Sequence, residues 1–361
     1  MSLENLRDTL SDVDRQIIEL VAERQRIVSE IGRNKRTEGA ATRDYAREKE
    51  VVDKGRAQAN DLGIDPDLAE SILTTLIRSS LASQERDRVV AEGKGDGRSV
   101  LVIGGAGKMG GWFVDFFASQ GFDVAIADAT VEDGPGRFRN WTDAGVDYDV
   151  IVVATPLAVS GRILAQLAVL KPTGLVFDIG SLKTPLIDGL HELVNAGCHA
   201  TSIHPMFGPD TRLLSGRHLI ICDAGSPEAT AAARELFDST MVEQLEMGLD
   251  EHDRHIAYVL GLSHALNIAF FTALAESGEA APALARMSST TFDSQLLVSS
   301  DVAHDNPHLY FEIQNLNRFG LGPLDALVDA SQRIREVVAK GDEQGFVDLM
   351  LNGREYLALR S

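Results

Sequence analysis

The segment VIGGAGKMGG at 102–111 limits the possible folds of this 361-residue chain more than any other stretch. It follows an apolar run, SVLVIG at 99–104, and precedes large apolar residues at helical spacing, which are Trp112, Phe113, Phe116 and Phe117. Gly105, Gly107 and Gly110 have the G-x-G-x-x-G spacing. In this pattern a strand turns tightly into a helix, whose first N–H groups can face a pyrophosphate. The segment therefore predicts a dinucleotide site.

Short apolar, β-branched runs alternate with helical patterns around this motif. The expected strands are 99–104, 123–128, 149–156 and 174–180. Such alternation is typical of a doubly wound parallel sheet. Beyond about Pro227 strand patterns nearly vanish, and Ala/Leu-rich helical patterns continue to the end. We therefore expect a Rossmann-type domain at 99–226 and an all-helical domain at 227–361.

The first ninety residues have a different pattern, with apolar residues at helical spacing and no strand-like run. We expect one long helix over 3–36, a second over 45–61, and a third over 67–88 that begins at the Pro66-Asp67 signal. The segment AEGKGDGR at 91–98 is rich in glycine and charge, which is typical of a linker. The sequence thus predicts an all-helical domain at 1–90, a linker at 91–98, and the α/β domain after it.

Composition excludes several classes of protein. The chain has 34 Lys+Arg against 54 Asp+Glu, a formal charge of −20, which disfavours nucleic acid and anionic membranes as partners. No apolar run reaches the roughly 18 residues of a membrane span, and the charged N-terminus does not resemble a signal segment, so we expect a cytoplasmic protein. Cys198 and Cys222 are the two cysteines. They form neither a disulfide framework nor a zinc-binding pattern, and no metal site is expected.

The identity of the dinucleotide is predicted from the end of the second strand. Asp128 ends this strand, where a carboxylate accepts hydrogen bonds from ribose hydroxyls and repels a 2′-phosphate. Residues 129–133 contain no cation that would attract such a phosphate, so NAD is favoured over NADP. The other residues expected at the cofactor are Lys108 and Met109 in the glycine motif and Thr155 and Pro156 after the third strand.

His204 is the candidate proton acceptor. It lies in IHPMFGPD at 203–210, which follows an apolar run, as do ATP at 154–156 and DIGSLK at 178–183. Loops at the carboxyl ends of parallel strands are expected to converge on one crevice. Hydride transfer from a carbinol needs a group that takes the hydroxyl proton, and a histidine suits that role. Ser181, Lys183 and Asp210 are expected near it.

Five motifs resemble those of prephenate dehydrogenases over nearly all of 98–361: GGAGKMGG, DIGSLK, HPMFGPD, EHD at 251–253 and NPHLYFEIQNLN at 306–317. The resemblance implies that His204 accepts the C4 hydroxyl proton of prephenate while hydride passes to NAD. Loss of the ring carboxylate as CO2 then gives 4-hydroxyphenylpyruvate. It also implies that Ser181 hydrogen-bonds the substrate hydroxyl and His204, and that Asp210 is an acidic site residue. His264 would face the substrate from the first helix of a C-terminal dimerisation domain.

His252 is expected to have a structural role. It precedes His264 by 12 residues, which corresponds to about 18 Å along a helix, so both imidazoles cannot contact one small ligand.

Asp301 is a departure from the family pattern. The family commonly presents an arginine to a substrate carboxylate, whereas a gap-free reading from HPMFGPD to NPHLY places Asp301 there. A carboxylate at that point opposes the binding of prephenate. Either Arg286, Arg318, Arg212 or a cation of a partner chain substitutes, or the substrate carries an amino group, as arogenate and 4-amino-4-deoxyprephenate do. A further alternative is a nucleotide-binding regulatory protein whose dehydrogenase site has decayed.

The N-terminal segment carries cations at spacings suited to a small dianion. Arg24 and Lys35 are 11 residues apart and point the same way along one helix. Arg7 is about 25 Å from Arg24 along that helix, so only the Arg7 of another chain can reach the same ligand.

The stretch 3–88 resembles the all-helical chorismate mutases. The resemblance implies an intertwined homodimer in which Arg7 of one chain completes the site of the other. It further implies that the substrate contacts Arg24, Lys35, Asp44, Arg47 and Ser80, with Glu48 and Gln84 near the breaking ether oxygen. The pericyclic rearrangement of chorismate to prephenate needs only a clamp that folds the substrate. Together the two resemblances imply a bifunctional enzyme whose first product is the substrate of its second reaction.

Overall fold

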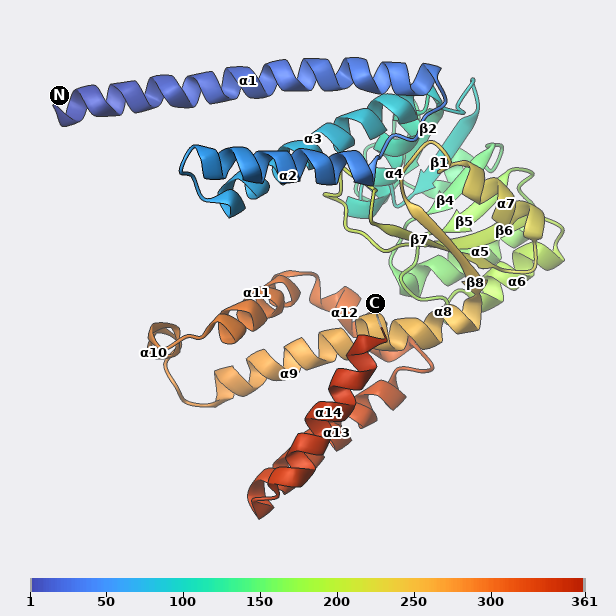
Figure 1. Cartoon of the computed structure of the whole chain (residues 1–361). Helices are drawn as coiled ribbons and strands as arrows, with labels where there is room; N and C mark the ends of the chain where they lie inside the picture. Colours follow the sequence, from blue (N-terminus) through green and yellow to red (C-terminus); the bar gives the residue numbers. More distant parts are fainter. Residues whose placement is uncertain (1, 360–361) are drawn as a thin grey trace. The chain divides into compact units, whose positions relative to one another are not determined.

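The computed structural model describes residues 2–359, which form two compact units (Figure 1). The first unit contains residues 2–155, 166–179 and 192–246, and so joins the N-terminal helices to most of the sheet. The second contains residues 156–165, 180–191 and the chain from 247 onward.

Three helices form the N-terminal part of the first unit: α1 (Leu3–Thr37), α2 (Tyr45–Asp61) and α3 (Pro66–Ala91). They confirm the predicted helices, with α3 a few residues longer. Side chains cap their starts, because Ser2 accepts from the N–H of Asn5 and Asp44 from that of Arg47. Helix α3 packs against both α1 and α2. Its buried face near the C-terminal end contains Ser80, Leu81, Gln84, Glu85 and Val89.

The first half of α1 is exposed on all sides. Residues 2–20 are all exposed, and they include a row of large apolar side chains: Leu3, Leu6, Leu10, Val13, Ile17 and Leu20. A contiguous exposed apolar surface of this kind marks a protein interface.

Eight strands form one sheet in the order β3-β2-β1-β4-β5-β6-β7-β8. Their bounds are β1 Ser99–Ile103, β2 Asp123–Ala127, β3 Arg137–Phe138, β4 Val150–Val153, β5 Leu175–Asp178, β6 His199–Pro205, β7 His218–Asp223 and β8 Glu243–Gly248. Strands β1 to β6 are parallel, and β7 pairs antiparallel with β6. The strand order reverses between β1 and β4, and this is where a doubly wound sheet binds its ligand. The predicted parallel sheet is confirmed.

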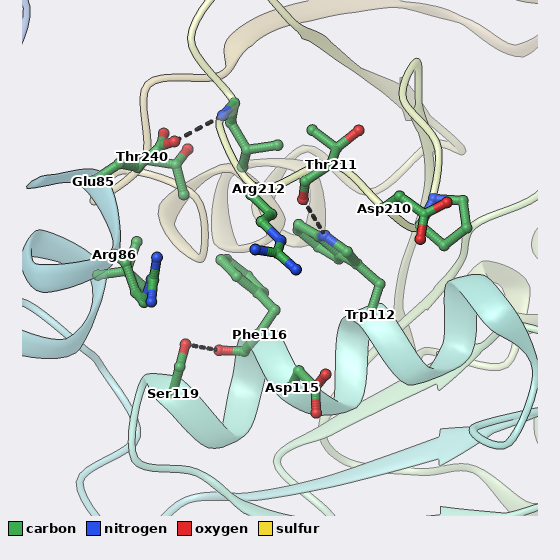
Figure 2. A pocket seen from close by; sticks show the side chains of 13 residues that line it. Glu85, Arg86, Trp112, Asp115, Phe116, Ser119, Asp210, Thr211, Arg212 and Thr240 are labelled. Carbon is green, nitrogen blue, oxygen red and sulfur yellow. Dashed lines mark hydrogen bonds between the residues drawn. The ribbon is translucent and has the colours of Figure 1, made fainter. Parts of the chain in front are cut away.

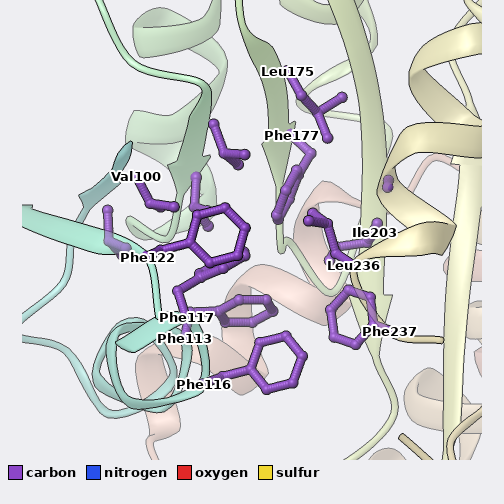
Figure 3. Packing of buried hydrophobic residues seen from close by; sticks show 14 of the residues in the cluster. Val100, Phe113, Phe116, Phe117, Phe122, Leu175, Phe177, Ile203, Leu236 and Phe237 are labelled. Carbon is purple, nitrogen blue, oxygen red and sulfur yellow. The ribbon is translucent and has the colours of Figure 1, made fainter. Parts of the chain in front are cut away.

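An aromatic core fixes α4 (Lys108–Ser119), the helix that follows the glycine motif (Figure 3). Phe116 stacks on Phe237 with ring centroids 4.9 Å apart, and Phe113 lies 6.2 Å from Phe177 of β5. Burying each such ring stabilises the fold by about 1.5–3 kcal/mol. The start of α4 is thereby held firmly against the sheet.

The first unit extends past 226, where the sequence placed the end of the α/β domain. Helix α7 (Pro227–Glu235) packs against β5, β6 and β7, and β8 is the last strand of the sheet. The sequence EQLEMG of β8 has no apolar run because most of its residues are partly or fully exposed. The absence of such a run is why the sequence pattern did not reveal this strand.

The predicted linker is a packed connection. Helix α3 continues to Ala91, and the N–H of Gly95 donates to the carbonyl of Gln120 at 3.0 Å. A Cβ atom on Gly93 would lie 2.5 Å from that same carbonyl oxygen, so the backbones approach too closely for a side chain. The glycines of this segment therefore allow close contact.

The second unit is helical, as predicted, but its C-terminal helices begin at Leu249. They are α8 (Leu249–Ile256), a π-helical turn (Ala257–Leu262), α9 (Ser263–Glu276), α10 (Ala281–Arg286), α11 (Thr290–His304), α12 (Pro307–Leu316), α13 (Leu321–Lys340) and α14 (Glu343–Ala358). Helices α5 (Leu157–Leu170) and α6 (Ile187–Asn195) precede them in the chain. The continuous run 249–276 is long and apolar enough to be a candidate membrane span by length and composition alone, which the sequence-based expectation did not include. It is weak evidence for a span, because it contains the buried His252 and Asp253.

Candidate active sites

The glycine motif forms a tight turn between β1 and α4. Gly104 has a φ of +90°, and a Cβ atom there would lie 2.5 Å from the carbonyl oxygen of Ala154. Gly104 therefore needs glycine's left-handed conformation, although it lies outside the G-x-G-x-x-G spacing of the motif. A Cβ on Gly110 would lie 2.1 Å from the carbonyl oxygen of Gly104, so Gly110 is needed for helix and strand to pack closely. Gly107 is the N-cap of α4.

Asp128 lies beside this turn. One oxygen of its carboxylate accepts from the N–H of Ala106 at 3.3 Å, and the other accepts from the N–H and hydroxyl of Thr130 at 2.9 and 2.7 Å. Lys108 and Met109 begin α4, and Thr155 follows β4 beside Gly104. Pro156 directly precedes α5, in the second unit. The exposed turn, the helix N-terminus and the carboxylate fit a dinucleotide.

His204 lies in β6 and is buried, with 5% of its surface exposed. It pairs with Ile220 of β7. The chain then forms the connection 206–217, in which Asp210 is exposed and borders a pocket of about 490 Å³ (Figure 2). Arg212 borders the same pocket, together with Trp112 and Phe116 of α4.

Ser181 follows β5 in a loop that belongs to the second unit. Its hydroxyl oxygen is buried and has no hydrogen-bond partner among residues 2–359. Asp253 fixes this loop, since its carboxylate accepts from the N–H of Lys183 at 2.8 Å and from both the N–H and the hydroxyl of Thr184 at 2.5 Å. The Lys183 ammonium is buried and donates to the carbonyl of Gly180 at 2.7 Å. The loop thus presents a hydroxyl group that is free to bind a ligand.

Asp253 was missed in the sequence, although the EHD motif contains it. Burial alone raises the pKa of this carboxyl, but hydrogen bonds from His252, Thr184 and Lys183 outweigh burial and hold the pKa below its ordinary value. The His252 ring is fully buried, with Nδ1 at 2.8 Å from the Asp253 carboxylate. This arrangement supports the structural role predicted for His252.

His264 is the second residue of α9, which directly follows the π-helical turn. Such turns are frequent at functional sites. Its ring stacks on Tyr310 with centroids 4.0 Å apart, and its Nδ1 is buried without a hydrogen-bond partner in the described chain. Burial lowers the pKa of His264, so the imidazole is neutral at pH 7. Burial and the charges of Asp305 and Asp301 raise the pKa of Tyr310 to about 12. The charge of Asp301 therefore acts on Tyr310, the residue whose ring stacks on His264.

Three arginines could bind a substrate carboxylate in place of the arginine that the family commonly has, and they lie in different parts of the chain. Arg318 forms an ion pair with Asp250 and lies over the ring of Phe319. Arg286 ends α10, is exposed, and forms no ion pair within residues 2–359. Arg212 lies in the first unit at the pocket described above.

Three of the predicted mutase residues meet between α1 and α3. The guanidinium of Arg24 donates to the hydroxyl of Ser80 at 2.5 Å and to the carbonyl of Leu76 at 3.2 Å. The amide of Gln84 donates to the carbonyl of Val28 at 3.1 Å. Burial lowers the pKa of Arg24. These residues provide a guanidinium, a hydroxyl and an amide on the inner faces of two helices.

The other predicted mutase residues have separate partners. Lys35 donates to the carbonyl of Thr42 at 2.8 Å, Arg47 pairs with Glu50 at 2.6 Å, and Asp44 caps α2. Glu48 accepts two hydrogen bonds from Arg43, both at 2.9 Å. Arg7 lies on the exposed half of α1. Arg43 was missed, although its position five residues before Glu48 across a helix start was a signal for this pairing.

Comparison with known proteins identifies three domains. Residues 6–85 match the type II chorismate mutase family, residues 129–243 the nucleotide-binding domain of prephenate dehydrogenase, and residues 249–352 the prephenate dehydrogenase dimerization domain. The match of 249–352 accounts for the apolar run 249–276 as part of a dimerisation domain.

Relatives match nearly the whole length of the chain. A T-protein of Enterobacter agglomerans is 28% identical over 348 residues, which cover 96% of this chain and 90% of the relative. A T-protein of Haemophilus influenzae is 25% identical, with coverage of 98% and 92%. The solved prephenate dehydrogenase of Aquifex aeolicus, in complex with hydroxyphenyl propionate and NAD+, has the same fold, with a TM-score of 0.56 at 16% identity over 73% of this chain and 98% of that one. The chain belongs to the bifunctional chorismate mutase/prephenate dehydrogenases of the T-protein type, NAD-dependent enzymes of tyrosine biosynthesis.

Proposed function

We propose that the second substrate is prephenate, that His204 accepts its C4 hydroxyl proton, and that Ser181 and His264 bind it. Bound NAD supplies the hydride acceptor, and Gly105, Gly107, Gly110 and Asp128 would hold it. As the C4 hydroxyl loses its proton to His204, the C4 hydride leaves the ring. The bond from the ring to its carboxylate then breaks, CO2 departs, and that electron pair completes the aromatic ring. The C4 oxygen takes back the proton from His204, which gives 4-hydroxyphenylpyruvate.

The unpartnered hydroxyl of Ser181 is the observation that carries this proposal. A buried hydroxyl without a partner costs about 1–3 kcal/mol, and a hydrogen bond from a bound substrate removes that cost. The neutral His264 has a second unpartnered atom, Nδ1, which a polar substrate group can satisfy. Asp253 supports Ser181 by fixing the loop on which it lies.

Asp301 favours a second candidate, an amino-bearing substrate such as arogenate or 4-amino-4-deoxyprephenate. Its carboxylate acts on Tyr310, which stacks on His264, so an ammonium group bound at His264 would be attracted to it. Prephenate has a keto group where arogenate has its ammonium, and a C4 hydroxyl where 4-amino-4-deoxyprephenate has its amine, so it gains nothing from Asp301.

The two candidates are tested by comparing kcat/KM for prephenate and for the two amino analogues with NAD. If prephenate is the substrate, it is turned over at least tenfold more efficiently than either analogue. Asp301→Arg is then expected to raise kcat/KM for prephenate about tenfold, because a guanidinium replaces a repelling carboxylate. Asp293→Arg, an equal charge change on the same helix, is the control and should have little effect. Preferential turnover of an amino analogue would contradict the assignment of prephenate.

For the mutase we propose a site in which Arg7 of a second copy joins Arg24, Lys35, Asp44, Arg47, Glu48, Ser80 and Gln84. The close contact of Arg24 with Ser80 and the exposed apolar row on α1 support it, because the row needs a partner and Arg7 lies within it. Arginine and lysine would clamp the two carboxylates of chorismate, and Gln84 would donate to its ether oxygen. The expected assembly is therefore a homodimer.

Mixed dimers test this arrangement directly. Arg7→Ala and Arg24→Ala are each expected to abolish most mutase activity. When the two variants are unfolded together and refolded, half of the dimers are mixed, and one of the two sites in each mixed dimer contains no substitution. Mutase activity should recover to roughly a quarter of the wild-type value. No recovery, with mixed dimers demonstrated by mass spectrometry, would show that Arg7 acts in its own chain.

A further inference from the structure

Two residues of the N-terminal domain, Glu85 in α3 and Arg43 just before α2, hold the connection between β6 and β7. The buried carboxylate of Glu85, on α3, accepts from the N–H of Leu214 at 2.7 Å and from the N–H of Met241 at 2.5 Å. The guanidinium of Arg43 donates to the hydroxyl of Ser215 at 2.7 Å. Two residues of the mutase domain thus fix neighbouring positions in a segment, 211–215, that belongs to the dehydrogenase.

Segment 211–215 borders an open pocket, so the hydrogen bonds from Glu85 and Arg43 are important for its position. These two residues are called the anchors of the segment. The pocket, of about 490 Å³, lies beside Trp112 and Phe116 and is lined by Thr211, Arg212 and Leu214 of the segment (Figure 2). A third contact to the segment comes from the indole N–H of Trp112, which donates to the carbonyl of Thr211 at 3.1 Å. Because space lies on one side of the segment, its position depends on individual hydrogen bonds more than on close packing.

The side chains of Arg43 and Glu85 are themselves held in place by neighbouring groups. Arg43 donates two hydrogen bonds to Glu48 and lies 4.2 Å from the centre of the Tyr45 ring. Burial raises the pKa of Glu85, whereas its two backbone donors and the charge of Arg88 lower it. A carboxylate kept in a buried place by two N–H donors has a defined orientation.

We propose that Arg43 and Glu85 are positioning residues of the dehydrogenase reaction, although they lie in the mutase domain. They act through segment 211–215 on residues 206–210, the part of the connection that directly follows β6, the strand that contains His204. This inference rests on the role proposed for His204. Each anchor also adjoins a proposed mutase residue, since Arg43 pairs with Glu48 and Glu85 follows Gln84 in α3. The mutase domain is therefore part of the support of the second active site.

Ser215→Ala and Glu85→Gln test the inference in the full-length enzyme. Ser215→Ala removes the acceptor for Arg43 and leaves the Arg43–Glu48 pair intact. It is expected to lower dehydrogenase kcat about fivefold, the effect of one hydrogen bond. Glu85→Gln leaves one backbone N–H facing an amide donor and is expected to lower kcat about tenfold or more. The KM for NAD should stay unchanged in both, because the hydrogen bonds that these substitutions remove do not involve the glycine turn or Asp128.

Four controls separate positioning from damage to the fold. Turnover is expressed per NAD-binding site, so an unfolded fraction does not lower kcat. Ser215→Thr keeps the hydroxyl and should restore at least half of the activity. Ser119→Ala, which alters the same pocket away from the segment, should change nothing, and mutase activity of Ser215→Ala should stay within about twofold of wild type.

The outcomes also separate this inference from the proposal for His204. Full dehydrogenase kcat in both Ser215→Ala and Glu85→Gln, while His204→Asn is inactive, would overturn the positioning inference alone. Full activity of His204→Asn would instead overturn the site on which the inference rests.

Discussion

His204→Asn is expected to lower dehydrogenase kcat by about a thousandfold and to leave the mutase reaction unchanged. Asparagine can still hydrogen-bond a hydroxyl group, but it cannot take up a proton at neutral pH. General-base catalysis contributes on the order of 10² to 10⁴ in rate, and removing the base removes that contribution. The measurement is NADH formation from prephenate at saturating NAD, with chorismate consumption measured on the same preparation.

His199→Asn is the matched control for this experiment. His199 lies at the start of the same strand, β6, but its side chain is exposed. Its replacement should change neither activity by more than about twofold. A His204→Asn enzyme that keeps more than a tenth of the wild-type kcat would assign the proton to another group.

Arg24→Ala is expected to lower mutase kcat/KM by about a hundredfold to a thousandfold and to leave dehydrogenase kcat unchanged. The substitution removes a charge-assisted, partly buried donor that the proposed site uses to hold a substrate carboxylate, and losses of this kind cost roughly 3–4 kcal/mol in the transition state. It also leaves the hydroxyl of Ser80 without its donor. The measurement is the disappearance of chorismate in the absence of NAD.

Arg26→Ala, an exposed arginine two residues further along α1, controls for the loss of positive charge and should retain full mutase activity. If Arg24→Ala and Arg26→Ala lower kcat/KM equally, the effect comes from long-range charge, and a specific clamp by Arg24 would be ruled out.

Local patterns were sufficient to predict much of this fold. The apolar spacing of 3–36 predicts α1 almost to the residue, and the glycine motif between an apolar run and an aromatic-rich helix predicts the β1–α4 turn. Gly104 is not part of the motif, which is defined by Gly105, Gly107 and Gly110. The lack of room for a Cβ atom at Gly104 comes from the backbone of Ala154, fifty residues later, which no local pattern reveals. Strand β8 was overlooked because an exposed edge strand needs no apolar run.

The residues that support the sites were harder to find, because their partners are remote in sequence. Glu85 contacts Leu214 across 129 residues, Arg43 contacts Ser215 across 172, and Asp253 contacts Lys183 across 70. A carboxylate on a helix face is usually solvated, and no local pattern distinguishes one that binds a distant backbone N–H. Such positioning residues emerge only when the fold brings the segments together.

Product analysis after feeding chorismate and NAD to the wild-type enzyme tests whether one protein carries out both reactions in sequence. Each chorismate consumed is expected to yield one 4-hydroxyphenylpyruvate, one CO2 and one NADH, with prephenate as the intermediate. Chorismate that is converted to prephenate and accumulates there, with no NADH formed from saturating NAD, would contradict this expectation.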